Sequence, residues 1–183
     1  MNKCVVWAVT LVVAFCAAAY AGPVEDYNKG LDYYDKKGDV ASAIKFLKKS
    51  SDAGYAPAQA LLGYIYDQSE QDKEAVEAYK KAAAQGNAAG LFGLGGMYAK
   101  GEGVKADMEK ALDFITRAAE KDCLLAVDVL CSTYRKGGLG VAADPEKFAY
   151  WKNKKKALEK AKADKEKAER EKAQKATERK EGK

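Results

Sequence analysis

Apolar and small residues recur along most of the chain at spacings of three and four, which is the period of an α-helix. No stretch shows the strict alternation of apolar and polar residues that is typical of a half-buried strand. Turn residues divide the helical pattern into eight predicted helices, at residues 25–37, 40–53, 57–67, 73–85, 88–99, 108–121, 124–136 and from 145 onward. The pattern therefore predicts an all-α protein.

The helical pattern is also repeated. Tyrosines mark the same place in four successive stretches, with spacings of 32, 32 and 36 residues, at Tyr34, Tyr66, Tyr98 and Tyr134. Aspartates that can cap free backbone N–H groups precede successive helices at Asp39, Asp72, Asp107 and Asp144. We therefore expect stacked pairs of helices that bury a continuous core, with the repeated tyrosines packed between helices.

Six glycines between Ala88 and Asp107 raise the question of a phosphate-binding loop. The motif GxxxxGK[ST] is absent, and no strand precedes a GxGxxG pattern. Most of these glycines hold positions of the repeat, and we expect Gly86, just before them, to end a helix in the left-handed conformation. Gly93 and Gly96 alone have no role in the repeat. We interpret the stretch as helix packing.

The unit "AVEAYKKAAAQGNAAGLFGLGGMYAKGEGVKAD", from Ala75 to Asp107, resembles the Sel1-like repeat, a relative of the tetratricopeptide repeat. The unit 43–72 follows the same pattern with a shorter turn, and the unit 111–144 follows it with one extra residue. The resemblance covers about residues 24–158. It implies a short right-handed α-solenoid of stacked helix pairs that acts as a protein-binding scaffold, often as an adaptor in envelope, secretion or signalling complexes.

The first residues have the features of a signal peptide. Lys3 precedes an almost unbroken apolar run, and Ala19 and Ala21 supply the small residues that a signal peptidase accepts. We expect cleavage after Ala21 and an exported protein, periplasmic or secreted, with no membrane span afterwards. The predicted organisation is a signal peptide at 1–21, the repeat solenoid at 22–158, and an Ala/Glu/Lys-rich helical tail at 159–183.

Charge is distributed unevenly along the chain. Residues 22–151 contain 17 Lys and Arg against 20 Asp and Glu, whereas residues 152–183 contain 14 against 7. After Leu158 the only apolar residues are alanines, so the tail has no coiled-coil seam. We expect a solvated helix that extends the last repeat helix. The alternative is a basic arm that binds an acidic surface, although interleaved glutamates and missing aromatics make nucleic acid an unlikely ligand.

The chain contains no histidine, which excludes Ser-His and Cys-His nucleophile pairs and histidine metal sites. We therefore predict a non-enzymatic protein with no cofactor and no metal. Ser42 and Lys45 match the S-x-x-K motif of penicillin-recognising enzymes, but the partner motifs are absent. An envelope enzyme of the β-lactamase or peptidoglycan-processing kind is the alternative from a different class.

Two cysteines remain after the predicted cleavage. Cys123 and Cys131 on one helix would lie about 12 Å apart, whereas a disulfide needs roughly 4.4–6.8 Å between Cα atoms. We expect no disulfide between them, with Cys131 as a buried packing residue and Cys123 at a turn.

Tyrosines outside the repeat frame are the candidates for a protein-binding face. Tyr33, Tyr55 and Tyr64 do not share the position of the repeated tyrosines, and Asp67 follows the last of them. We predict that these four residues contribute to an exposed face that contacts a protein partner.

Overall fold

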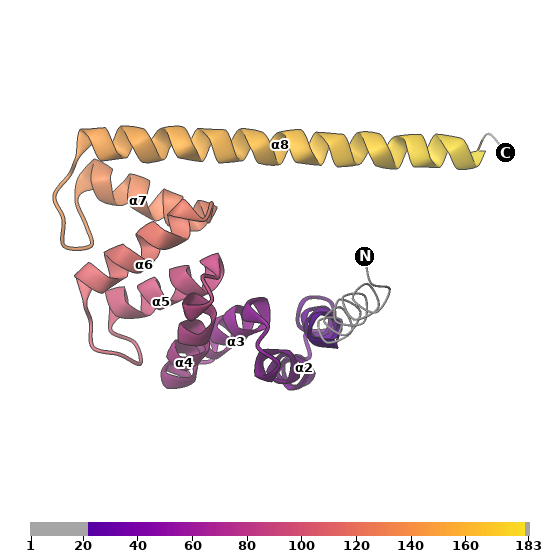
Figure 1. Ribbon diagram of the computed structural model, residues 1–183, viewed down its shortest axis with the longest axis horizontal. Coiled ribbons are helices and arrows are strands. Elements are labelled where there is room, and N and C mark those ends of the chain that lie inside the picture. The colour runs from indigo at the N-terminus through magenta and orange to yellow at the C-terminus, as the bar shows by residue number, and fades with distance from the viewer. Residues whose placement is uncertain (1–21, 182–183) are drawn as a thin grey trace, which may run out of the picture. The chain divides into compact units, whose positions relative to one another are not determined.

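The computed structural model describes residues 22–181, which form helices joined by short turns and contain no strand (Figure 1). Residues 22–35 form the first helix. The others are α2 (Val40–Asp52), α3 (Ala56–Gln68), α4 (Asp72–Ala84), α5 (Ala88–Lys100), α6 (Met108–Glu120), α7 (Leu124–Lys136) and α8 (Pro145–Glu181). The first seven predicted helices are thus present, with small shifts at their ends. The predicted signal peptide, residues 1–21, lies outside the described residues.

Contacts between residues divide the chain into two compact units, and the boundary falls inside α6. The first unit ends at Phe114 and the second begins at Ile115. In the first unit, α3 contacts α2, α4 and α5, and α4 also contacts α5. Its core includes Ala43, Leu47, Ala58, Leu62, Ile65 and Ala78. Because α3 and α5 are the second helices of consecutive repeat units, equivalent residues of the two helices lie on the same face.

Tyr79 of α4 lies at the centre of the contact between α3, α4 and α5, and it is 4% exposed. A Cβ atom on Gly63 of α3 would lie 2.5 Å from Cδ1 of the Tyr79 ring. A Cβ atom on Gly93 of α5 would lie 2.3 Å from Cε1 of the same ring. Both glycines are therefore required by the ring, and Gly93 has a packing role that the repeat pattern did not reveal.

Three of the four predicted aspartate caps are present. The carboxylates of Asp39, Asp107 and Asp144 each accept a hydrogen bond from the backbone N–H three residues later, at 3.0 Å. The prediction for Asp72 was wrong, because Asp72 is the first residue of α4 and Gln71 precedes the helix without a side-chain cap. The carbonyl of Gln71 accepts the bond that those of Asp39 and Asp107 accept in the other units. Asp72 therefore stands one residue too late to cap the helix.

The turns that close the helix pairs use left-handed residues. Gly54 and Gly86 have φ angles of 84° and 72°, and Gly86 confirms the prediction made for it. Asp122 occupies the corresponding place in the third unit with a φ of 64°. The third turn thus keeps the backbone conformation without a glycine, which is unusual for an L-residue.

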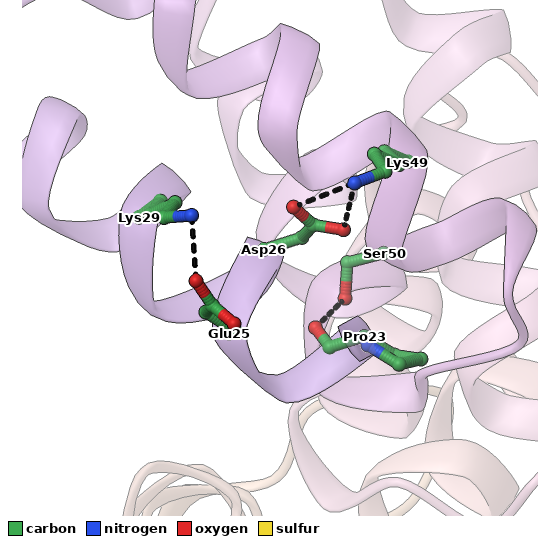
Figure 2. A network of polar contacts seen from close by, with 6 residues as sticks. All are labelled: Pro23, Glu25, Asp26, Lys29, Lys49 and Ser50. Carbon is green, nitrogen blue, oxygen red and sulfur yellow. Dashed lines mark hydrogen bonds and ion pairs between the residues drawn. The ribbon is translucent and has the colours of Figure 1, made fainter. Parts of the chain in front are cut away.

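The helix over residues 22–35 is fixed to α2 by a small polar network, which Figure 2 shows from close by. The Ser50 hydroxyl, fully buried, donates a hydrogen bond of 2.6 Å to the carbonyl of Pro23. Lys49 Nζ lies 3.1 Å and 2.9 Å from the two carboxylate oxygens of Asp26, a residue that is 6% exposed. These contacts anchor the first residues that the structure describes.

In the second unit, α7 packs along the first part of α8, and the rest of α8 extends beyond α7 (Figure 1). Trp151 of α8 is buried, as is Leu130 of α7. Lys154 pairs with Asp122 at 2.9 Å, and Lys155 pairs with Asp128 at 2.7 Å. From residue 159 to residue 174 every side chain is exposed to solvent.

Two glycine substitutions in α5 provide a direct test of the packing around Tyr79. Gly93→Ala places a methyl group against the ring and should destabilise the protein by about 1–3 kcal/mol through overpacking. Gly96→Ala meets nothing within 4 Å and should instead gain up to about 1 kcal/mol from helix propensity. Urea unfolding followed by circular dichroism measures both. Equal midpoints for the two variants would contradict the packing described here.

Candidate functional site

The four residues predicted to form a binding face occupy different environments. Tyr33 stacks on Phe46 with ring centroids 5.4 Å apart, and Tyr55 makes an edge-to-face contact with Tyr27 at 5.3 Å. Both are half-buried against the core of the first unit. Tyr64, in contrast, is 45% exposed. Among the three tyrosines, Tyr64 is therefore the one that is most exposed to solvent.

Tyr64 belongs to a cluster of polar groups around Tyr79. Burial raises the pKa of the Tyr79 hydroxyl, and the nearby Asp67 and Tyr64 raise it further. Tyr64 also contacts Tyr34 edge-to-face, with ring centroids 6.4 Å apart. Burial, and then the nearby Tyr64, raise the pKa of Tyr34. The structure thus brings together two of the four predicted residues, Tyr64 and Asp67, with two phenols from other helices.

Gly96 lies on α5, the helix that packs beside α3, and the space at its Cβ position is open. It is the repeat counterpart of Tyr64, so the two residues occupy equivalent positions on neighbouring helices. No heavy atom lies within 4 Å of a Cβ atom built on Gly96. We call Tyr64, Asp67, the Tyr79 hydroxyl and Gly96 the Tyr64 surface. It combines an exposed ring, a carboxylate, a phenol and a bare stretch of helix.

Sequence reasoning missed Tyr79. It follows Ala75 by four residues, and the same position in the other units is occupied by Leu47 and Ile115. A polar aromatic residue at an otherwise aliphatic position was the available signal. Its link to Gly63 and Gly93 needed the three-dimensional contacts of α4 with α3 and α5.

The repeated tyrosines lie between elements, as the packing interpretation requires. Tyr134 is buried, and Tyr98 stacks on Phe114 with centroids 5.7 Å apart. The carbonyls of Tyr98 and Tyr134 accept hydrogen bonds from the N–H groups of Asp107 and Asp144, so they also close the turns that lead to the capped helices.

A hollow lies between α7 and α8 within the second unit, with a volume of about 720 Å³. Cys131 and Phe148 line it together with charged side chains, among them Arg135, Lys152 and Lys156. Cys131 is partly buried, whereas we predicted a buried packing residue. Cys123, also partly exposed, precedes α7 as its N-cap residue, and both thiols are free.

Ser42, the candidate nucleophile of the alternative reading, belongs to a helix cap. It is the third residue of α2, and its backbone N–H donates to Asp39. A hydrogen bond from its side chain and then that from its N–H hold the pKa of Asp39 below its usual value. The cap therefore gives Ser42 a structural role that needs no catalytic function. Within residues 22–181 no group of acidic or cysteine side chains could hold a metal ion.

The family model described as "Sel1 repeat" matches residues 17–55, 56–87 and 88–123. The chain belongs to the Sel1 repeat family. Sel1 repeats are typically scaffolds for protein–protein interaction. The family model does not extend over the last predicted units, so the boundary at Leu158 stays a prediction.

Solved structures agree with this assignment. A Sel1 repeat protein from Oxalobacter formigenes is 29% identical over 76% of this chain, with a TM-score of 0.67. A protective antigen present in uropathogenic Escherichia coli strains, which displays an SLR fold, is 31% identical over 76% of this chain, with a TM-score of 0.65. The matches span 58% and 34% of those two chains. A comparison with curated proteins found no match.

These findings confirm the expected all-α solenoid fold of Sel1-like helix pairs. In the part of the chain that the structure describes, no helix has the length and apolar character needed to cross a membrane.

The pKa of Cys131 gives a prediction for thiol chemistry. Burial, and then the nearby Asp128 carboxylate, raise this pKa above its ordinary value. Less thiolate is therefore present near neutral pH, and alkylation by iodoacetamide should be slow and increase at a higher pH than for an ordinary thiol. The measurement is the alkylation rate of the Cys123→Ser protein against pH, with the same protein in denaturant as its reference. An inflection at or below that of the unfolded chain would show that burial does not control this thiol.

Proposed function

We propose that the protein is an exported, non-enzymatic scaffold that holds a partner protein on the Tyr64 surface of its Sel1 repeats. The observation that carries the proposal is the exposure of Tyr64 on the first unit. Aromatic side chains anchor many protein interfaces because they bury a large area at low cost in conformational entropy. The half-buried Tyr33 and Tyr55 lie on the same unit and add possible contacts at its periphery.

The non-enzymatic role is supported by the residues themselves. The chain has no histidine, and the hydroxyl of Ser42 is engaged by the Asp39 cap. A β-lactamase-like activity would require Ser42 to form a covalent adduct with a β-lactam. We expect no labelling by a fluorescent penicillin, and labelling that disappears in Ser42→Ala would favour the enzyme instead.

The second candidate function is binding through the basic tail. Its support is the full exposure of side chains 159–174 on α8, in a segment where Lys and Arg outnumber Asp and Glu. Such a segment can bind an acidic surface through charge, and this binding weakens as salt rises.

A pull-down from envelope extract separates the two candidates. The baits are residues 22–183, a version that ends at Leu158, and full-length Tyr64→Ala and Tyr150→Ala, each at low and high salt. Tyr150 is the matched control because it is 60% exposed but lies in the second unit. We expect both wild-type baits and Tyr150→Ala to hold the partner in high salt, and Tyr64→Ala to bind at least about fivefold less. Loss of the partner with the tail would favour the basic arm.

Export is tested independently of binding. Mass spectrometry of the native protein recovered from its own cells should find Gly22 as the first residue, because the small residues at 19 and 21 position the cut. A native protein that starts at Met1 and stays with the cytoplasmic fraction would exclude the export proposal.

A further inference from the structure

We propose that the Tyr64 surface recognises a cationic side chain, an arginine or a lysine, in a basic segment of the partner protein. This inference rests on the proposed function and adds to it the chemistry of the partner. Three features of the surface support it: a phenol that can accept a hydrogen bond, an unpaired carboxylate and open space beside an exposed ring.

The first feature is the hydroxyl of Tyr79. The residue is 4% exposed, but its hydroxyl is not among the buried polar atoms without a partner in the described part of the chain, so this end of the side chain is reached by water. The ring carbon that carries the hydroxyl lies 2.4 Å from the Cβ position of Gly93, so this end of the ring is directed at α5. Gly96 follows Gly93 by one helical turn. The phenol oxygen can therefore exchange a water for a hydrogen bond donated by a ligand.

The second feature is the charge around this hydroxyl. Asp67 makes no ion pair in the described part of the chain, and it lies close enough to Tyr79 to raise the pKa of that phenol. The nearby cation, Lys100, is already paired with Glu102 at 3.0 Å. The bond to Glu102 raises the pKa of Lys100, and Asp67 and Asp72 add to the rise. Carboxylates thus outnumber cations here, which favours a positive ligand.

The third feature is the space that the side chains leave. Tyr64 presents an exposed ring, and Gly96, at the equivalent position of the neighbouring helix, has no side chain to fill the space beside it. A guanidinium or ammonium group placed there would lie over the ring and within reach of Asp67. Contact with the ring face and a charge-assisted hydrogen bond would both stabilise it.

Other ligand chemistries fit these groups less well. An anion would approach Asp67, and repulsion between like charges disfavours that contact. An apolar side chain would remove water from Asp67 and from the Tyr79 hydroxyl without giving either a partner, which costs free energy. A cation neutralises the carboxylate and can also donate a hydrogen bond to the phenol oxygen.

The test uses two peptides that differ only in charge, acetyl-Gly-Arg-Gly amide and the same peptide with citrulline in place of arginine. Each is titrated into the ¹⁵N-labelled protein, residues 22–183, and amide shifts are followed at Tyr64, Gly93 and Gly96. We expect saturable shifts with the arginine peptide, with a Kd on the order of millimolar, and at least about fivefold weaker binding of citrulline. Equal binding of the two peptides would overturn the proposal.

Two variants change single groups of the surface with little change in shape. Asp67→Asn removes the charge, and Tyr79→Phe removes the hydroxyl while keeping the ring between its glycines. Each should weaken the arginine peptide at least about fivefold, whereas Asp52→Asn, an exposed carboxylate outside the cluster, should not. Thermal unfolding of each variant shows whether the fold is retained. Unchanged affinity in folded Asp67→Asn and Tyr79→Phe would overturn the proposal.

The same variants separate this inference from the proposed function. If the envelope partner is lost from Tyr64→Ala but held undiminished by Asp67→Asn and Tyr79→Phe, the scaffold function stands and cation recognition is wrong. If Tyr64→Ala holds the partner as well as the wild type does, the assignment of the function to the Tyr64 surface fails.

Discussion

The close packing of α3 and α5 around the ring of Tyr79 is the contact on which the first unit depends. The ring fits only because Gly63 and Gly93 have no side chains, and each glycine weakens its own helix relative to alanine. The contact offsets that weakness by burying a large aromatic surface. It also determines where the hydroxyl of Tyr79 lies, so the packing of the core and the chemistry of the surface are set by one residue.

Helix positions could be predicted from the sequence because they depend on local signals. The spacing of small and apolar residues, the left-handed Gly86 and the caps at Asp107 and Asp144 act within a few residues of the chain. The error at Asp72 arose from the same kind of signal. An aspartate near the start of a helix predicts a cap. The residue whose carbonyl accepts the first hydrogen bond of α4, however, is Gln71.

Less of the candidate site could be predicted from the sequence. The sequence singles out Tyr64 because it stands outside the repeat, and Asp67 as its acidic neighbour. Tyr33 and Tyr55 also stand outside the repeat, but they are half-buried by Phe46 and Tyr27. Exposure depends on which neighbours cover a ring, and those neighbours come from other helices. For the same reason the partial exposure of Cys131 required the position of α8 along α7.

Residues that match the repeat pattern pack the helices against one another. Residues that depart from the pattern distinguish this protein from other members of the family. Tyr79 replaces an aliphatic residue, and Gly96 replaces the tyrosine that α3 carries at the same place. In a repeat protein each unit contacts mainly its neighbours, so such departures can change one surface without altering the rest of the array. The Tyr64 surface is formed where two departures meet.

The buried hydrogen bond from Ser50 to Pro23 limits when a signal peptidase could cut the chain relative to the docking of the first helix. Gly22 is already helical, and Pro23 is already anchored to α2. A protease needs a locally unfolded stretch around the bond that it cuts. If processing occurs after Ala21, the cut must therefore precede the docking of this helix or wait for it to undock. Maturation and the docking of this helix would then compete for the same few residues.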